Sequence, residues 1–271
     1  MGECGPRRES GGCVASAANA RYASAVSRRQ PNSEPHVRVQ RTREGKFLYV
    51  DGSCASVWQP GVAMTGGSWD LLAAPVLLVP GRAPRVLLLG VGGGTVIRVV
   101  RALCPEAEIV GIDLDADVLA VARREFALDA LGATNEIADA QRFLRDLPRG
   151  ERFDVIVDDI YERGPTDMRK PRGWGATLRR AAARLRPGGV LVCNALDARD
   201  ARELSASLPP PVIALMHADY HNHILVGGRG LSARKVGRAL RASTLLGPTM
   251  RRTTIRALNS SEPVGIPSPS P

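Results

Sequence analysis

Short apolar runs alternate with helical patterns along the middle of the chain. Because strands that alternate with helices pair in parallel and bury both faces under helices, this pattern predicts an α/β fold with a doubly wound parallel sheet. Val212 to His217 and His223 to Val226, joined by a turn at 219–222, predict a closing antiparallel hairpin. The expected strands cover 86–89, 108–112, 135–138, 154–157 and 190–193, and the expected helices cover 96–103, 118–126, 142–147, 177–185 and 199–208.

Three short segments before this region alternate apolar and polar residues instead. They cover 36–40, 47–51 and 54–59, with Glu44-Gly45 and Asp51-Gly52 between them. This spacing predicts a small N-terminal antiparallel β-appendage. We therefore divide the chain into a disordered leader (1–35), the β-appendage (36–62), the main α/β domain (63–228), a basic helical extension (229–258) and a disordered Ser/Pro tail (259–271).

Composition excludes several classes of protein. The chain has 271 residues, of which 44% are hydrophobic and 24% charged, as in ordinary globular proteins. Its apolar runs are shorter than the roughly 20 residues that cross a bilayer, so we expect no membrane role and a cytoplasmic location. A transit peptide in the Ser- and Arg-containing leader is the alternative. The five scattered cysteines form no CxxC pair, which argues against disulfides and zinc.

Charge is distributed unevenly. The formal net charge is +10, and residues 229–271 hold eight basic residues and one acidic residue, Glu262. Residues 85–228 hold 19 basic and 20 acidic residues. The basic C-terminal segment is either a solvated helical face or a contact for nucleic acid. Oligomeric state, including a homodimer, is left open.

A glycine-rich loop follows the first strand of the main domain. Gly90, Gly92 and Gly94 lie in the run Gly90-Val91-Gly92-Gly93-Gly94-Thr95. Glycines allow a tight turn and close approach of a ligand, and free amides at the start of a helix favour an anionic group such as a carboxylate. Such a loop is weak evidence by itself, because structural turns also use it.

Acidic residues end the next three strands. Asp113 follows the second strand, about twenty residues after the glycine loop, where a carboxylate can accept ribose hydroxyls. Asp139 follows the third strand, where an acid can accept a hydrogen bond from an adenine amino group. Asp158 and Asp159 follow the fourth strand and are expected to face the reacting atom. Four strand-end features in register predict a nucleotide-type cofactor site.

These residues carry a resemblance. The run VLLLGVGGGTVIRVVRALCPEAEIVGIDLDADVLAVARREFAL, followed by EIADAQRFL, FDVIVDD and LRPGGVLVCNAL, resembles the spermidine-synthase-like branch of the S-adenosylmethionine-dependent methyltransferase superfamily. The resemblance covers about 85–228 and implies a Rossmann-like methyltransferase sheet. It also implies that S-adenosylmethionine, or its decarboxylated form, is bound by Gly90, Gly92 and Gly94, with Asp113 at the ribose and Asp139 at the adenine.

Two departures from the branch bear on the reaction. Spermidine synthases carry an aspartate in a GGGDGG loop at the aminopropyl end of the donor, and Gly93 stands at that position. Spermidine synthases also carry a DSSDP-type motif with two acids. When this chain is aligned to the motif on Gly164-Pro165, Asp158 stands at the first acid and Tyr161 at the second acid. A shift by one residue uses Asp159 and Glu162 instead.

These departures favour methyl transfer to a small-molecule or protein acceptor. The alternatives are aminopropyl transfer to a polyamine and a catalytically silent nucleotide-binding or scaffold domain. A polyamine, with amine pKa values near 10.4, needs carboxylates that pair with it and remove a proton.

Two further features have competing interpretations. Trp69 either packs the appendage against the sheet or lines the acceptor pocket, and Asp70 either reaches the cofactor or caps the following helix. His217, Asp219, His221 and His223 resemble a metal cluster, but the expected turn at 219–222 breaks their common face, so we expect no metal.

Overall fold

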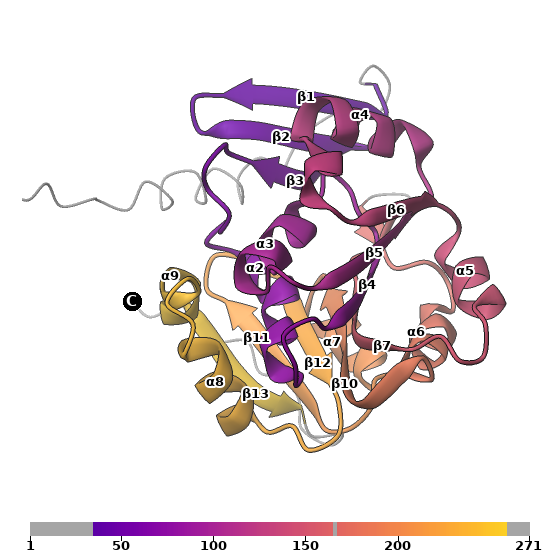
Figure 1. Ribbon diagram of the computed structural model, residues 1–271, viewed down its shortest axis with the longest axis vertical. Coiled ribbons are helices and arrows are strands. Elements are labelled where there is room, and N and C mark those ends of the chain that lie inside the picture. Colours follow the sequence, from indigo (N-terminus) through magenta and orange to yellow (C-terminus); the bar gives the residue numbers. More distant parts are fainter. Residues whose placement is uncertain (1–34, 165–166, 259–271) are drawn as a thin grey trace, which may run out of the picture.

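The computed structural model describes residues 35–164 and 167–258, and within these ranges an eight-stranded sheet forms the centre of the molecule (Figure 1). The strand order is β13-β11-β12-β10-β7-β4-β5-β6. The five strands from β10 to β6 pair in parallel, and the remaining three pair antiparallel. The bounds are β4 Arg85–Leu89, β5 Glu108–Asp113, β6 Thr134–Ile137, β7 Phe153–Asp158, β10 Leu185–Ala195, β11 Val212–His217, β12 His223–Gly227 and β13 Thr253–Leu258.

Helices cover both faces of this sheet because alternate strand residues point to opposite sides. Val86 and Leu88 belong to the apolar cluster beneath the first group of helices, whereas Leu87 and Leu89 belong to the cluster beneath the second group. The first group is α2 Ser68–Ala73, the 3-10 turn η1 Ala74–Leu78, α3 Thr95–Leu103, α4 Ala116–Phe126 and α8 Ala233–Arg241, and the second is α5 Ala140–Asp146, α6 Trp174–Ala182 and α7 Ala198–Ser205.

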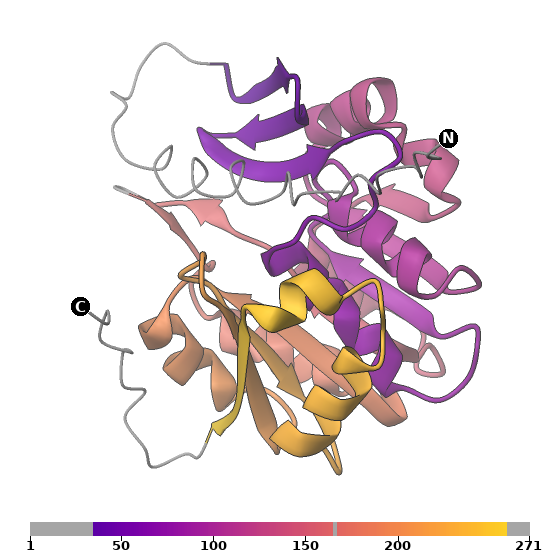
Figure 2. The same cartoon turned by 90° about the vertical axis from the view of Figure 1, so that its left-hand side faces the viewer.

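The β-appendage is a separate three-stranded sheet that packs against α4. Its strands are β1 Val37–Thr42, β2 Gly45–Val50 and β3 Ser53–Trp58. Leu48 packs against Val118 and Phe126 of α4 in a small apolar cluster. The appendage lies at the top of both views and α8 at the bottom (Figures 1 and 2).

The expected strands, helices and closing hairpin of the main domain are confirmed, with ends that differ by a few residues. The C-terminal extension needs a correction. Residues 229–258 hold α8 and α9 (Gly247–Arg251), but they end in β13, which pairs with β11 at the edge of the main sheet. Thr253 is buried and Ile255 packs against the core. Both are β-branched residues, which favour strands. The expected leader (1–35, except its last residue) and tail (259–271) lie outside the described residues.

None of the described helices is long and apolar enough to cross a membrane. Within 35–164 and 167–258, no group of three or more His, Cys, Asp or Glu side chains is arranged to hold a metal ion. His217 is buried, and its ring contacts that of Tyr220 at a centroid distance of 5.3 Å.

Candidate functional site

The carboxyl ends of β6, β5, β4 and β7 lie next to one another at one edge of the sheet. The glycine loop at 90–94 follows β4, Asp113 ends β5, Asp139 follows β6 and Asp158 ends β7. Strand register pairs the last residue of β4 with Asp158, and Asp113 with Ile137. The structure therefore brings the predicted strand-end residues to one edge.

The backbone amides of the glycine loop already have partners within the protein. The amides of residues 91 and 92 donate to Oδ2 of Asp113 at 2.9 and 3.0 Å. The amide of Gly93 donates to Oγ of Ser56 at 2.7 Å, and that of Gly94 donates to the carbonyl of residue 91 at 3.0 Å. Internal acceptors therefore occupy the amides of 91–94, whereas the free amides that the sequence predicts belong to the first turn of α3, which begins at Thr95.

At Gly90 and Gly93, among other positions of the loop, a Cβ atom would collide with a neighbouring segment. Gly90 has φ +89°, and a Cβ there would lie 2.8 Å from the backbone oxygen of Asp159. A Cβ at Gly93 would lie 2.8 Å from Cβ of Ser56 and 3.2 Å from Cδ1 of Phe126. Since such contacts are shorter than real Cβ atoms show, any side chain at position 93 must displace β3 or α4. The β-appendage thus lies directly against the glycine loop.

Asp113 is half-buried and holds this loop. Its Oδ2 accepts the two loop amides, and its Oδ1 accepts the amide of Asp115 at 3.1 Å. A carboxylate offers about four acceptor sites, so one remains for a ligand hydroxyl. The sequence suggested two ribose hydroxyls at this acid, and the internal bonds leave room for one.

Asp139 lies beside exposed apolar side chains. Its Oδ1 caps α5 by accepting the amide of Arg142 at 2.8 Å. Leu114, directly after β5, is 68% exposed, and Ile137, at the end of β6, is 56% exposed. Large apolar side chains with that exposure flank a polar acceptor here, which suits a flat, partly apolar ring with an amino group.

Asp158 does not face open space. It is fully buried, and its Oδ2 accepts from Nζ of Lys170 at 2.8 Å, Nε1 of Trp174 at 3.0 Å and Sγ of Cys193 at 3.1 Å. Burial lowers the pKa of Lys170, but the Asp158 carboxylate outweighs this and raises that pKa above its ordinary value. The expected position of Asp158 at the reacting atom does not fit these contacts, which make it the buried half of an ion pair.

Asp159, which directly follows Asp158, is half-buried. Nδ2 of Asn194 donates to its Oδ1 at 2.7 Å, and Nδ2 of Asn222 donates to Oδ1 of Asn194 at 2.9 Å. Burial raises the pKa of Asp159 to about 6, and the Asn194 hydrogen bond and the Lys170 charge oppose that rise. A carboxylate with a pKa near neutrality can orient or deprotonate an acceptor.

Tyr161 and Glu162 point to different environments. The hydroxyl of Tyr161 donates to the backbone oxygen of Asn194 at 2.5 Å, and Nζ of Lys170 lies 4.2 Å from the centre of its ring. Burial raises the pKa of Tyr161 well above its usual value. Glu162 lies on the two-residue strand β8 (Glu162–Arg163), which pairs with β9 (Met168–Arg169), and it forms a salt bridge with Arg169. Tyr161 therefore packs beneath the strand end, and Glu162 belongs to the hairpin above it.

Asp70 and Trp69 lie in the core. Asp70 is fully buried. Its Oδ1 accepts hydrogen bonds from the amide and the hydroxyl of Thr65, and its Oδ2 accepts from the amide of Gly66 and the hydroxyl of Thr249, at 2.6 to 2.8 Å. These four donors match a role in fixing the loop before α2 rather than contact with a cofactor. Trp69 is buried in the apolar cluster under α2 and α3.

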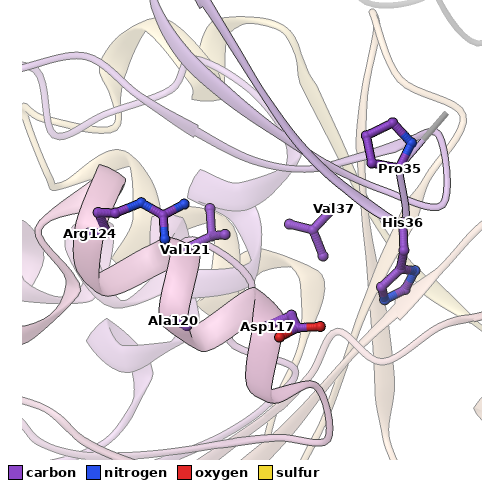
Figure 3. Close-up of a pocket in the computed structure, with 7 residues that line it drawn as sticks. All are labelled: Pro35, His36, Val37, Asp117, Ala120, Val121 and Arg124. Carbon is purple, nitrogen blue, oxygen red and sulfur yellow. The ribbon is translucent and has the colours of Figure 1, made fainter.

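A pocket of about 360 Å³ lies between β1 and α4 (Figure 3). His36 and Asp117 lie at one end of it and Arg124 at the other. The His36 ring also bridges two carboxylates, with Nδ1 2.8 Å from Oδ1 of Asp51 and Nε2 2.5 Å from Oδ2 of Asp115. This bridge ties the appendage to the N-terminus of α4, next to Asp113.

Sequence reasoning missed three residues at this edge: Ser56, Lys170 and Asn194. Ser56 and Lys170 lie 37 and 12 residues from their partners, Gly93 and Asp158, and no local pattern marks them. Asn194 had a signal, because it is the polar residue that follows the apolar run Val190 to Cys193 of a strand next to β7.

Comparisons with known proteins match the part of the chain that holds these strand ends. The family described as "Methyltransferase domain" matches residues 86–189. The chain is 30% identical over 121 residues to a polyamine aminopropyltransferase 2 from Caldanaerobacter subterraneus subsp. tengcongensis, covering 44% of this chain and 39% of the relative. It is 38% identical over 102 residues to a release factor glutamine methyltransferase from Bordetella pertussis, covering 37% of each. The chain thus spans about two fifths of the length of these relatives.

The fold agrees with solved structures as well. The crystal structure of a probable spermidine synthase from Corynebacterium glutamicum superposes with a TM-score of 0.64 at 17% identity, covering 82% of this chain and 87% of that one. At this level of identity the likeness shows the shared fold.

Proposed function

We propose that this chain, a spermidine-synthase-like protein of the S-adenosylmethionine-dependent methyltransferase fold, transfers the methyl group of S-adenosylmethionine to an acceptor at the end of β7. The donor's sulfonium carbon supplies the electrophile when the cofactor is bound. The residues of the chain bind the donor, place the acceptor in line with that carbon, and take up the proton that the acceptor loses.

The strand-end residues fit the nucleoside part of this donor. The exposed Leu114 and Ile137 offer apolar faces for the adenine ring, and Asp139 offers an acceptor for its amino group. The remaining acceptor site on Asp113 suits one ribose hydroxyl. The glycine loop contributes close backbone approach, since its amides are bonded internally.

The contact between Gly93 and Ser56 is the observation that favours methyl transfer over aminopropyl transfer in this proposal. In the branch that this chain resembles, the loop aspartate at the Gly93 position lies at the aminopropyl end of the donor. Here Ser56 fills the space that a side chain at position 93 would need, with its Cβ 2.8 Å from an added Cβ. A carboxylate for a charged aminopropyl donor is therefore replaced by packing of the β-appendage, which supports methyl transfer.

Asp159 is the acceptor-facing acid in this proposal. Lys170 neutralises Asp158. In this proposal Asp158 therefore anchors the loop after β7. Asp159 keeps one hydrogen bond from Asn194, and its pKa of about 6 leaves it ionised at neutral pH. In that state it accepts the hydrogen bond of an acceptor N–H or O–H and orients the lone pair toward the methyl group.

Aminopropyl transfer is the second candidate, and the relative named as a polyamine aminopropyltransferase favours it. Its chemistry needs carboxylates for a polycationic substrate. Asp159 can supply one of these, but Asp158 is bound to Lys170 and Tyr161 occupies the second acidic position of the motif.

Parallel transfer assays distinguish the two candidates. Purified chain is incubated with methyl-labelled S-adenosylmethionine and fractionated protein and small-molecule extracts, and separately with decarboxylated S-adenosylmethionine and putrescine. We expect label in an acceptor only with the first donor, and its loss in Asp159→Asn. Spermidine formation in the second assay would establish aminopropyl transfer instead, and no product in either assay would favour a silent domain.

A further inference from the structure

The solvent face of α8 carries a row of cations that form no salt bridge with a carboxylate of residues 35–164 or 167–258. Within this helix Val236, Gly237 and Leu240 are buried and pack toward η1 and β13. Positions four and seven residues after Arg234 share one side of a helix with it. The exposed side chains on this face are Arg234, Lys235, Arg238 and Arg241.

Neighbouring segments extend this basic face. Arg229 precedes α8 and Arg251 ends α9, both exposed, and α9 contacts α8. Residues 229–258 contain eight basic residues and no acidic one. Among the described residues none of these six cations forms a salt bridge, whereas the nearby Arg252 pairs with Asp219. We define the α8 face as residues 229, 234, 235, 238, 241 and 251. Figure 2 shows α8 and α9 on the side that faces the viewer.

We propose that the α8 face binds the phosphate backbone of a double-stranded nucleic acid, without regard to sequence. Five of its six cations are arginines, whose planar fork matches phosphate oxygens. Residues 229–258 contain no Phe, Tyr or Trp, so the face lacks the rings on which single-stranded bases stack. The row from 234 to 241 is about 10 Å long at 1.5 Å per residue, a length suited to a few phosphates.

The packing of α8 argues against a membrane partner. An interfacial helix inserts an apolar face into the lipid, but the apolar face of α8 is buried against its own fold. The charge of the face is therefore available to a polyanion while its apolar side chains are not. This proposal does not depend on the proposed transfer reaction, because the α8 face and the strand-end site share no residue.

The test measures binding of the full chain to a fluorescein-labelled 20-base-pair DNA duplex by anisotropy as salt is raised. With about four phosphates neutralised, affinity falls on the order of 100-fold between 50 and 200 mM salt. The variant Arg234→Gln/Lys235→Gln/Arg238→Gln/Arg241→Gln should lose at least tenfold at 50 mM salt. The variant Arg234→Lys/Arg238→Lys/Arg241→Lys should retain most of the duplex binding. This result would separate an effect of lost charge from an effect of lost folding.

A matched control removes four charges from the opposite face of the sheet. Arg145, Arg149, Arg180 and Arg202 are exposed on or near α5, α6 and α7, and replacing all four by Gln should leave duplex affinity within about twofold. Duplex RNA, poly(dT), phosphatidylserine vesicles and poly-glutamate are titrated in parallel. Equal losses in the two quadruple variants, no duplex binding by the wild type at 50 mM salt, or tighter binding to vesicles, poly(dT) or poly-glutamate than to duplex would overturn the proposal.

Discussion

The amide of Gly93 donates to the hydroxyl of Ser56 at 2.7 Å, and this bond joins the glycine loop to the β-appendage. Thr95 strengthens the same junction, because its hydroxyl donates to the carbonyl of Val57 and accepts the amide of Val57. The appendage therefore forms one wall of the loop that lies beside the proposed donor.

A side chain at position 93 should loosen this junction. Gly93→Ala places a methyl group against Ser56, so it should lower the free energy of unfolding by about 1 to 3 kcal/mol, the usual cost of overpacking. Ser56→Gly removes the opposing atoms and should recover part of that loss in the double variant. Urea unfolding of both single variants and the double variant measures the coupling. Purely additive effects would show that the two residues do not compete for space.

The buried pair of Asp158 and Lys170 should matter for stability more than for reaction. Lys170→Met leaves the buried Asp158 without its counter-charge, which should cost about 3 to 5 kcal/mol. Adding Asp158→Asn removes the unpaired charge and should restore much of this loss in urea unfolding. A double variant as unstable as Lys170→Met would contradict the ion-pair assignment.

The sheet was predictable because its signals are local. The strands β4, β5 and β7 are apolar runs that are followed by a glycine or end in an acid, and Asp113 and Asp139 are predicted from their places at strand ends. The ion pair of Asp158 was not predictable, since Lys170 reaches it from the loop after β9. The edge strand β13 was missed because its one arginine, Arg256, continues the basic pattern of the preceding helix, and only pairing with β11 distinguishes a strand from a helix here.

Asp159 should couple activity to stability. Its folded pKa of about 6 exceeds its ordinary 3.8, so the native state binds the proton more tightly and loses stability as pH rises from about 4 to about 6. Asp159→Asn should therefore gain up to about 3 kcal/mol at pH 8 and little at pH 3.5, while kcat/KM of the wild type rises with pH through about 6. Urea unfolding at both pH values checks this, with the exposed Asp129→Asn as control. An equal gain at both values would refute the raised pKa.

His36 should give a pH dependence of the same sign, because its folded pKa is also raised above its ordinary value. Hydrogen bonds to Asp115 and then Asp51 raise its pKa above 6.5, so its contribution is complete below pH 6.5 and is lost as pH rises through the folded value. Relative to wild type, His36→Gln should be destabilised at pH 5.5 and nearly unchanged at pH 9. Thermal unfolding at the two pH values measures the difference, and the same deficit at both would show that the bridge carries no titrating charge.

The donor site is the central claim, and calorimetric titration with S-adenosylmethionine tests it most directly. Wild type should bind, and Asp113→Asn should weaken binding about tenfold or more, because a hydrogen bond to a charged acceptor contributes about 1.5 to 3 kcal/mol. Asp139→Ala should weaken binding as well, while the exposed Asp146→Asn on α5 should match the wild type. Undiminished binding in Asp113→Asn and Asp139→Ala, or no binding by a folded wild type, would contradict the placement of the donor at these strand ends.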